Sequence, residues 1–405
     1  MLRGFPRAPV RRGLRRARRV PQRDLRSGDG ARDGAPRVFW RATAWQGLAN
    51  IRALVVSAIV VNWNGKAYLP ECLDALLAQD PPVAEVILVD NHSDDGSREL
   101  VADRYPKVRV IDTGRNAGPC HARNVGLAAA ASERCLVLDN DVVMHPGALA
   151  ALQHCMDQDP RAAMVQARSL CGDDQNVVHY DGGDLHFLGT LVLHNWYRPL
   201  VEASRPTGPV GAAIALCFLT RKSVYTAVGG FDENLFILYE DNEFSYKLRM
   251  RGHTVWLCPE ALCTHKGGTA GLSVRGQSAY PGRRTYLHSK NRWYVLIACM
   301  HWRTFWLTVP AQLVYGVVYA GFGWRRGHIG DWLQGKWELL QLLPKAVRAR
   351  GPAQAGRTVR DRDLLVAAPV TLNPGLAERG WKGALRRTLD RFFAGYWRVV
   401  RRLCG

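Results

Sequence analysis

The chain has 405 residues, 47% hydrophobic and 22% charged, a composition that excludes global disorder and suffices for one large α/β domain or two smaller domains. Its net charge of +20 is uneven. Residues 1–41 hold 13 basic and 3 acidic residues, residues 345–405 hold 14 and 4, and the body between them is neutral. Such tails favour an anionic surface over nucleic acid as a partner. The ten cysteines form no C-x-x-C motif, which favours a reducing compartment over a disulfide scaffold or structural zinc.

Organised patterning begins near Ile51, after an Arg-, Pro- and Gly-rich tail (residues 1–50) that we predict to be disordered. Apolar strands then alternate with helical segments, which predicts βαβ units and a mixed, mainly parallel sheet with helices on both faces. The predicted strands are Leu54–Val61, Glu85–Asp90, Val108–Asp112, Arg134–Asp139, Ala162–Ser169 and His253–Cys258. The predicted helices are Tyr68–Ala78, Ser97–Tyr105, Pro119–Ala131, Pro146–Gln158, Arg221–Val228 and Glu240–Arg251. Residues 172–208 are expected to form a hairpin and loop.

Polar residues stand at the ends of three of these strands: Asn62, Asp90 and Asp139. Ligands of open α/β sheets bind outside the carboxyl ends of the strands, so this repeated placement indicates a binding site. For any one of them alone, capping of the next helix is an equal alternative.

The segment Asp139-Asn140-Asp141 places two carboxylates two residues apart after a buried strand. Hard oxygen donors of this kind suit Mg²⁺ or Mn²⁺ held together with phosphate oxygens. The D-x-D pattern occurs often by chance, and its position within βαβ units is what makes it informative.

Three further segments carry polar groups suited to group transfer. The Gly/Pro loop that begins at Asn116 opens a helix, and Arg123 on that helix would favour a diphosphate; a turn with a surface arginine is the alternative. The pair Glu240-Asp241 starts another helix, where carboxylates either stabilise the helix dipole or supply a general base. His265 is predicted just beyond the last strand, and a lone histidine is more often structural than a ligand.

Together these motifs resemble the family 2 glycosyltransferases of the GT-A fold, and among them the rhamnosyltransferase-like bacterial members. The resemblance covers roughly residues 52–300 and rests on five motifs in the family's order. They are Val60–Gly65, Val89–Ser97, Asn116–Gly118 with Ala122–Gly126, Asp139–Asp141, and Gly229–Glu233 with Glu240-Asp241.

The resemblance implies a nucleotide-sugar site and an inverting displacement. It would place Asn62 and Asp90 in the nucleoside pocket, with Asp90 near the base. The diphosphate would be neutralised by Arg123, and Asn116 would lie in the same site.

The resemblance also implies a metal site and a base. Asp141 would be the principal ligand of a Mg²⁺ or Mn²⁺ ion. Asp139 would approach the ribose or the ion, and His265 would complete the contacts. Asp241 would be the catalytic base, supported by Glu240.

The sequence departs from the family pattern at two places, of which the first touches the helix more than the base and the second bears on the product. Glu243 and Phe244 stand where Asp and Leu are typical after the Glu-Asp pair. The stretch Ser289–Trp293 retains Arg-Trp but lacks the Gln of the Q-x-x-R-W motif of processive synthases, which favours transfer of a single sugar.

The expected function is therefore transfer of one hexosyl or deoxyhexosyl unit to a glycan or lipid-linked acceptor in cell-envelope assembly. Two alternatives stay open from the sequence. One is a basic membrane- or nucleic-acid-binding protein with a non-catalytic α/β body, and the other is a nucleotidyltransferase.

The C-terminal part is expected to bind a membrane. We predict a catalytic domain over residues 51–300, an apolar helical segment over 301–345 and a basic amphipathic region over 346–405. The segment Phe305–Phe322 is long enough to span a bilayer, but Pro310 and Gln312 favour helices lying at the interface. Apolar residues at helical spacing between Leu385 and Leu403, with arginines around them, indicate a helix on an anionic bilayer or, alternatively, one packed on the domain. The expected location is the cytoplasmic face of the membrane.

Overall fold

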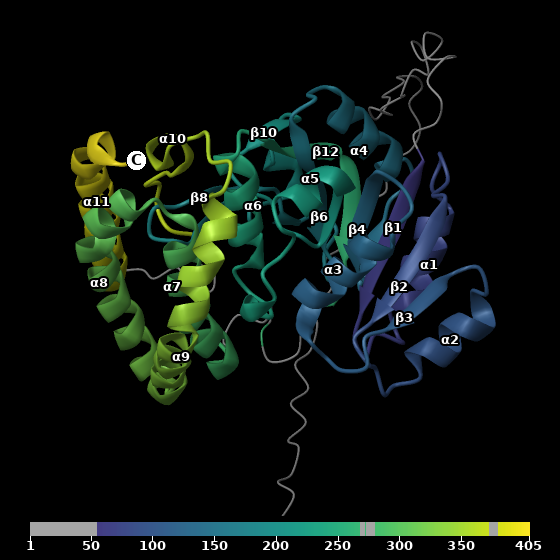
Figure 1. The fold of residues 1–405 in the computed structure, drawn as a ribbon, viewed down its shortest axis with the longest axis horizontal. Coiled ribbons are helices and arrows are strands. Elements are labelled where there is room, and N and C mark those ends of the chain that lie inside the picture. Colours follow the sequence, from purple (N-terminus) through teal and green to yellow (C-terminus); the bar gives the residue numbers. More distant parts are fainter. Residues whose placement is uncertain (1–54, 268–271, 273–279, 372–379) are drawn as a thin grey trace, which may run out of the picture. The chain divides into compact units, whose positions relative to one another are not determined.

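The computed structural model describes residues 55–267, 272, 280–371 and 380–405. The predicted disordered tail, residues 1–50, lies outside these residues. Figure 1 shows the fold, in which Arg52–Gly405 forms one compact unit.

A ten-stranded mixed sheet forms the centre of this unit. Its strands are β1 (Val56–Asn62), β2 (Glu85–Asp90), β3 (Arg109–Asp112), β4 (Arg134–Asp139), β5 (Val142–Met144), β6 (Ala162–Cys171), β7 (Val178–Tyr180), β10 (Gly208–Val210), β11 (Cys217–Arg221) and β12 (Thr254–His265). Their order is β10-β12-β6-β11-β4-β1-β2-β3, with β5 beside β12 and β7 beside β6. A separate pair, β8 (Gly183–Leu185) and β9 (Leu191–Leu193), forms the hairpin predicted within residues 172–208.

Helices cover both faces of the sheet, and further helices follow in the C-terminal part. In chain order the helices are α1 (Leu69–Leu77), α2 (Ser97–Arg104), α3 (Gly118–Ala129), α4 (Ala148–Asp157), α5 (Lys222–Ala227), α6 (Glu240–Met250), α7 (Gly282–Cys299), α8 (Trp302–Arg325), α9 (Ile329–Gln354), α10 (Asp361–Leu364) and α11 (Trp381–Val400), with 3-10 turns η1 (Leu200–Glu202), η2 (Glu233–Leu235) and η4 (Arg401–Leu403). Successive side chains of β1 point to opposite faces of the sheet, and both faces are apolar. Ile59 and Val61 join one core cluster with α3 and α6, and Ala58 and Val60 join another with α1 and α4. The predicted sheet with helices on both faces is thus confirmed.

The last strand is longer than the sequence pattern predicts. We expected it to end at Cys258, but β12 continues to His265 because it keeps pairing with β6 after an irregularity between Cys258 and Leu262. Its far end also pairs with β5, a short strand that the sequence did not reveal. His265 is therefore held within the sheet and does not lie beyond it.

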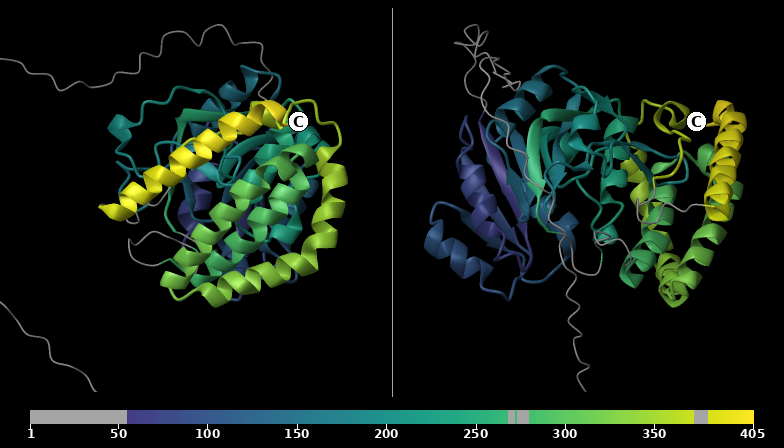
Figure 2. Two further views of the ribbon diagram at one scale, coloured as in Figure 1. Left: turned by 90° about the vertical axis from the view of Figure 1, so that its left-hand side faces the viewer. Right: turned by 180° about the vertical axis from the view of Figure 1, so that it is seen from behind.

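The C-terminal helices form a layer at the end of the unit away from β3 (Figures 1 and 2). Helix α9 packs on α7, and α8 contacts α9 and α11. The predicted boundary at residue 345 falls inside α9, whose helix continues past Pro344.

Helix α11 turns much of its apolar face toward the protein. Phe393, Trp397 and Val400 are buried, and the Trp397 ring stacks on Phe187 with centroids 5.0 Å apart. The buried aromatic side chains fill the space beside Phe187 and α8, as expected for a helix packed on the domain. Leu385, Phe392 and Val399 stay exposed, so binding of this helix to a bilayer stays a prediction.

Candidate active site

The carboxyl ends of three neighbouring strands bring the predicted polar residues together. In the parallel ladders, Asn62 at the end of β1 pairs with Asp90 of β2, and Val61 pairs with Asp139 of β4. The Asn140 amide then donates to Asn62 Oδ1 at 2.6 Å. Side chains that are far apart in the sequence thus line one edge of the sheet, as the strand-end pattern predicted.

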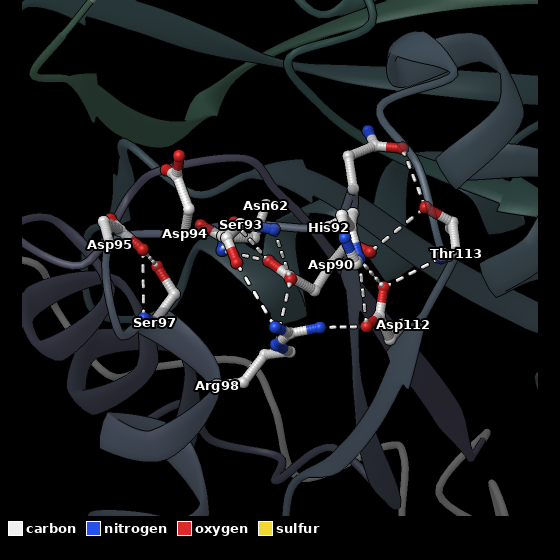
Figure 3. A network of polar contacts seen from close by, with 12 residues as sticks. Asn62, Asp90, His92, Ser93, Asp94, Asp95, Ser97, Arg98, Asp112 and Thr113 are labelled. Carbon is white, nitrogen blue, oxygen red and sulfur yellow. Dashed lines mark hydrogen bonds and ion pairs between the residues drawn. The ribbon is translucent and has the colours of Figure 1, made fainter.

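Asp90 lies at the centre of a closed hydrogen-bond network (Figure 3). Its Oδ1 accepts from Asn62 Nδ2 at 2.7 Å and from Ser93 Oγ at 2.5 Å, and its Oδ2 accepts from the Ser93 backbone N–H at 2.8 Å. Arg98 lies 3.7 Å away and also bonds Asp112. Because Asp90 is fully buried, it fixes the loop after β2, and a direct role at the nucleoside base stays a prediction.

Arg123 joins two parts of the site. It is buried in α3 and donates to Asp139 Oδ1 at 2.9 Å and to Glu240 Oε1 at 3.4 Å. Burial acts to lower the pKa of the guanidinium, but the carboxylates of Asp139 and Glu240 outweigh it and raise the pKa. A permanent cation therefore stands between the strand carboxylate and the helix that carries the Glu-Asp pair.

Glu240 and Asp241 occupy the first turn of α6. The Asp241 carboxylate accepts from the backbone N–H of Ala215 at 2.8 Å. Burial, and next the charge of Glu240, raise the pKa of Asp241 to about 8. Burial also raises the pKa of Glu240, and Arg123 opposes that shift. A carboxyl whose pKa lies near the operating pH suits a general base.

The metal-ligand candidates Asp141 and His265 face each other across β5 and β12. His265 Nε2 lies 3.1 Å from Asp141 Oδ2, and its Nδ1 lies 3.0 Å from Nδ1 of His179. His179 is buried on β7 and holds the ring orientation of His265. The sequence analysis missed His179, because it lies in a stretch without strand or helix periodicity.

Asp139 connects the metal-ligand side with the base side. Burial raises the pKa of Asp139, Arg123 opposes that shift, and the charge of Asp141 adds to it. The charge of Asp139 in turn contributes, after burial and Glu240, to the raised pKa of Asp241. The predicted residues from β4, α6 and β12 therefore share one electrostatic environment. Asp139 itself pairs with Arg123, so its place as a metal ligand stays a prediction.

Asn116 stands apart from this cluster. Its side chain is exposed, and its Oδ1 accepts from the backbone N–H of Gly118 two residues later at 3.1 Å. The contact orders the turn that starts α3. Gly118 has φ +86°, and a Cβ there would lie 2.7 Å from the Phe236 ring. The loop thus packs against the segment that precedes α6, and a sugar-nucleotide contact of Asn116 stays a prediction.

A divalent cation fits the donor set on one edge. The carboxylate of Asp141 and the imidazole of His265 are donor types that divalent cations accept, and the two groups lie in direct contact at 3.1 Å. Within the described residues, Glu240 Oε2 and Arg123 Nε are buried without a hydrogen-bond partner. Polar atoms of this kind are left for a ligand to satisfy.

The mixed sheet with helices on both faces is that of the GT-A fold. Residues 57–227 match the family model described as "Glycosyl transferase family 2". The chain therefore carries a family 2 glycosyltransferase domain and is a glycosyltransferase, as its motifs predicted.

Three proteins illustrate the similarity. The chain is 28% identical over 263 residues to the N-acetylglucosaminyl-diphospho-decaprenol L-rhamnosyltransferase of Mycobacterium tuberculosis, covering 59% of this chain and 85% of that protein. It is 24% identical over 232 residues to the dTDP-rhamnosyl transferase RfbF of Shigella flexneri, covering 55% and 72%. The structure of GalNAc-T7 with UDP, GalNAc and Mn²⁺ shares the fold, with TM-score 0.50 and 16% identity over 72% of this chain and 57% of that chain.

Proposed function

We propose that the chain transfers one sugar, with inversion, from a nucleotide-diphosphate sugar to a hydroxyl group of a glycan or lipid-linked acceptor in cell-envelope assembly. The arrangement of Arg123 carries this proposal. This buried cation bridges Asp139 at the strand edge and Glu240 beside Asp241. A diphosphate and a general base can therefore act within one site.

The chain's own groups account for the displacement. Asp241 takes the proton of the attacking hydroxyl, and its raised pKa makes it a stronger base than an ordinary carboxylate. The attacking oxygen bonds to the anomeric carbon as the bond to the diphosphate breaks. Arg123 stabilises the negative charge that develops on that leaving group. Asn62 and the Asp90 network hold the loops of the nucleoside pocket.

A Mg²⁺ or Mn²⁺ ion would be held by Asp141 and His265, joined by Asp139. When bound, it would neutralise diphosphate charge as a Lewis acid. His179 would orient His265 through the contact between their Nδ1 atoms.

The sugar and the acceptor are inferred from the relatives. Two of them are rhamnosyltransferases by name, and the first acts on a decaprenol-linked glycan by name. We infer a hexosyl or deoxyhexosyl donor and a glycan or polyprenol-linked acceptor for this chain. Nucleic acid is not expected as a partner.

The surface of α8 and α9 supports a peripheral membrane location. Helix α8 is long and apolar enough to span a bilayer, but Gln312 at its middle donates to Phe187 O at 2.7 Å and accepts from Arg292, which fixes α8 to the catalytic domain. Only 22% of its apolar window is buried. We infer that α8 lies in the interface plane of a membrane.

Exposed apolar residues on the two helices recur at spacings of three, four and seven, so each helix presents a stripe. On α8 they include Trp302, Trp306, Leu313, Val317 and Trp324, and on α9 Leu333, Trp337, Leu340 and Val347. Trp306, Trp324 and Trp337 are 67%, 72% and 64% exposed, far more than a soluble surface normally shows for tryptophan.

The charges on α8 also suit a membrane surface. Exposed arginines lie near both ends of α8 at Arg303 and Arg325, and the helix has no carboxylate. Aromatic residues beside cations match an anionic bilayer interface. All ten cysteines lie among the described residues and none is in a disulfide there, which fits the cytoplasmic face.

Sedimentation with anionic phosphatidylglycerol vesicles tests this location. The full chain is expected to pellet, and Val317→Glu is expected to stay in the supernatant. Val201 is 96% exposed on η1, so Val201→Glu makes the matched control and is expected to pellet. Equal pelleting of both variants would show that the exposed face of α8 does not bind the membrane.

A donor screen tests the enzymatic proposal. Release of nucleoside diphosphate from a panel of nucleotide sugars is followed with Mn²⁺ or with chelator, for the wild type and Asp241→Asn. Release of pyrophosphate would indicate a nucleotidyltransferase instead. Turnover that survives both chelation and the substitution would refute the mechanism.

A further inference from the structure

The residues just before α6 form a turn that L-amino acids rarely adopt. Phe236, Leu238 and Tyr239 have φ values of +63°, +66° and +77°, and none of them is glycine. At Phe236 the ψ value is −73°, and the N–H of Ile237 donates to Leu235 O at 2.8 Å. These values define the rare, strained form of the γ-turn. Side chains in this region of backbone space disfavour it, so other contacts must hold it.

Asn291 of α7 supplies those contacts. Its Nδ2 lies 2.9 Å from Leu235 O, 3.0 Å from Ile237 O and 2.7 Å from Leu238 O. An amide group has two protons, so one of them is shared among these carbonyl groups. Asn291 is fully buried, and water cannot replace it as a donor. One turn earlier on α7, His288 Nδ1 lies 2.9 Å from the Tyr239 hydroxyl.

The other side of the turn is closed by α3. The space for a Cβ at Gly118 is taken by the Phe236 ring and by Phe236 O, at 2.7 and 2.8 Å. Close packing against Gly118 therefore holds the turn on one side, and the hydrogen bonds of Asn291 hold it on the other. Tyr239 is the N-cap of α6, and Asp241 follows two residues later. The geometry of the turn sets where the Asp241 carboxylate lies.

We propose that Asn291 is a positioning residue for sugar transfer: it holds the strained turn Phe236–Tyr239, and the turn places Asp241 against the acceptor hydroxyl. This inference rests on the proposed function, because it takes Asp241 as the base. Without Asn291, the carbonyls of Ile237 and Leu238 lose a buried donor and the turn relaxes toward negative φ. Asp241 then moves with the start of α6.

The first test compares two α7 variants. Asn291→Ala is expected to lower kcat on the order of 10²-fold, the cost of a displacement of about 1 Å, while the KM for the donor is unchanged. Ser289→Ala is the matched control. Ser289 is also buried on α7, but its hydroxyl donates to Trp332 O at 2.7 Å on the α9 side. Its kcat is expected to be that of the wild type. Equal kcat values for the two variants would overturn the proposal.

The second test relieves the strain directly. Glycine adopts positive φ without cost, so Leu238→Gly is expected to restore part of the kcat lost in Asn291→Ala. Leu238→Gly is also expected to raise the melting temperature of Asn291→Ala less than that of Ser289→Ala, because the relaxed turn of Asn291→Ala has already released part of the strain. A role of Asn291 in packing alone predicts no rescue of kcat and equal increases in melting temperature, and that combination refutes the inference.

The melting temperatures do not depend on the reaction. If the wild type transferred no sugar, the proposed function would fail, and the difference between the two increases in melting temperature would still decide whether Asn291 holds the turn. If Asn291→Ala did not fold alone, the double variant is expected to fold, and its failure to do so would count against the inference.

Discussion

Replacing Asp241 by Asn tests the chemical role of the base with little change in shape. The Asn oxygen can still accept from Ala215 N–H, which the carboxylate does at 2.8 Å. The helix start is therefore retained, and only the ability to take a proton is lost. We expect kcat to fall by about 10²–10⁴-fold.

The pKa of Asp241 also sets how strongly kcat of the wild type should depend on pH. With a pKa of about 8, roughly a tenth of Asp241 is ionised at pH 7 and roughly nine tenths at pH 9, so kcat of the wild type should rise about tenfold over that interval. The residual activity of Asp241→Asn should not follow that curve. The assay is release of nucleoside diphosphate at saturating donor and acceptor, from pH 6 to 9. A flat wild-type profile, or an Asn variant of near wild-type kcat, would refute the reasoning.

Stability provides a second readout of the same group. The pKa of Asp241 is higher in the folded chain than the ordinary value of about 4, so the folded chain holds an extra proton between about pH 4 and 8. The contribution of Asp241 to the free energy of unfolding therefore decreases as pH rises from about 4 to about 8. Asn is neutral throughout, so the melting temperature of Asp241→Asn should exceed that of the wild type, with a gap that widens from pH 5 to 8. A constant gap would contradict the raised pKa.

Three further substitutions address the rest of the site. His179→Ala should weaken Mn²⁺ binding about 10–100-fold by calorimetry, because His265 loses its orienting contact; unchanged affinity would remove His179 from the metal site. Arg123→Lys should lower kcat and also the melting temperature, because a single ammonium cannot serve both Asp139 and Glu240 as the guanidinium does; wild-type kinetics would contradict a role at the diphosphate. Gly118→Ala should lower the melting temperature, since a Cβ would meet the Phe236 ring at 2.7 Å and φ is +86°; a neutral result would mean that the loop readily shifts.

Local sequence signals determined the sheet and placed polar residues at its carboxyl edge. Apolar runs of strand length, separated by helical segments, predicted β1, β2, β3, β4 and β6 to within a few residues. The polar residues at the strand ends followed from the same pattern, because the carboxyl ends of parallel neighbours meet at one edge. That is why Asn62 and Asp90 pair in the ladder as expected. The order of the motifs also predicted the family domain.

Long-range packing decided the remaining features, and no local signal carried them. His179 reaches His265 only because β7 pairs with β6, beside β12. Asn291 meets the turn before α6 only because α7 packs on α6. The amphipathic pattern of α11 fits a bilayer and a protein surface equally well, since both bury apolar side chains, and only the tertiary structure showed that Trp397 stacks on Phe187. The sequence by itself determined which groups line the edge of the sheet, and the tertiary structure determined which of them touch.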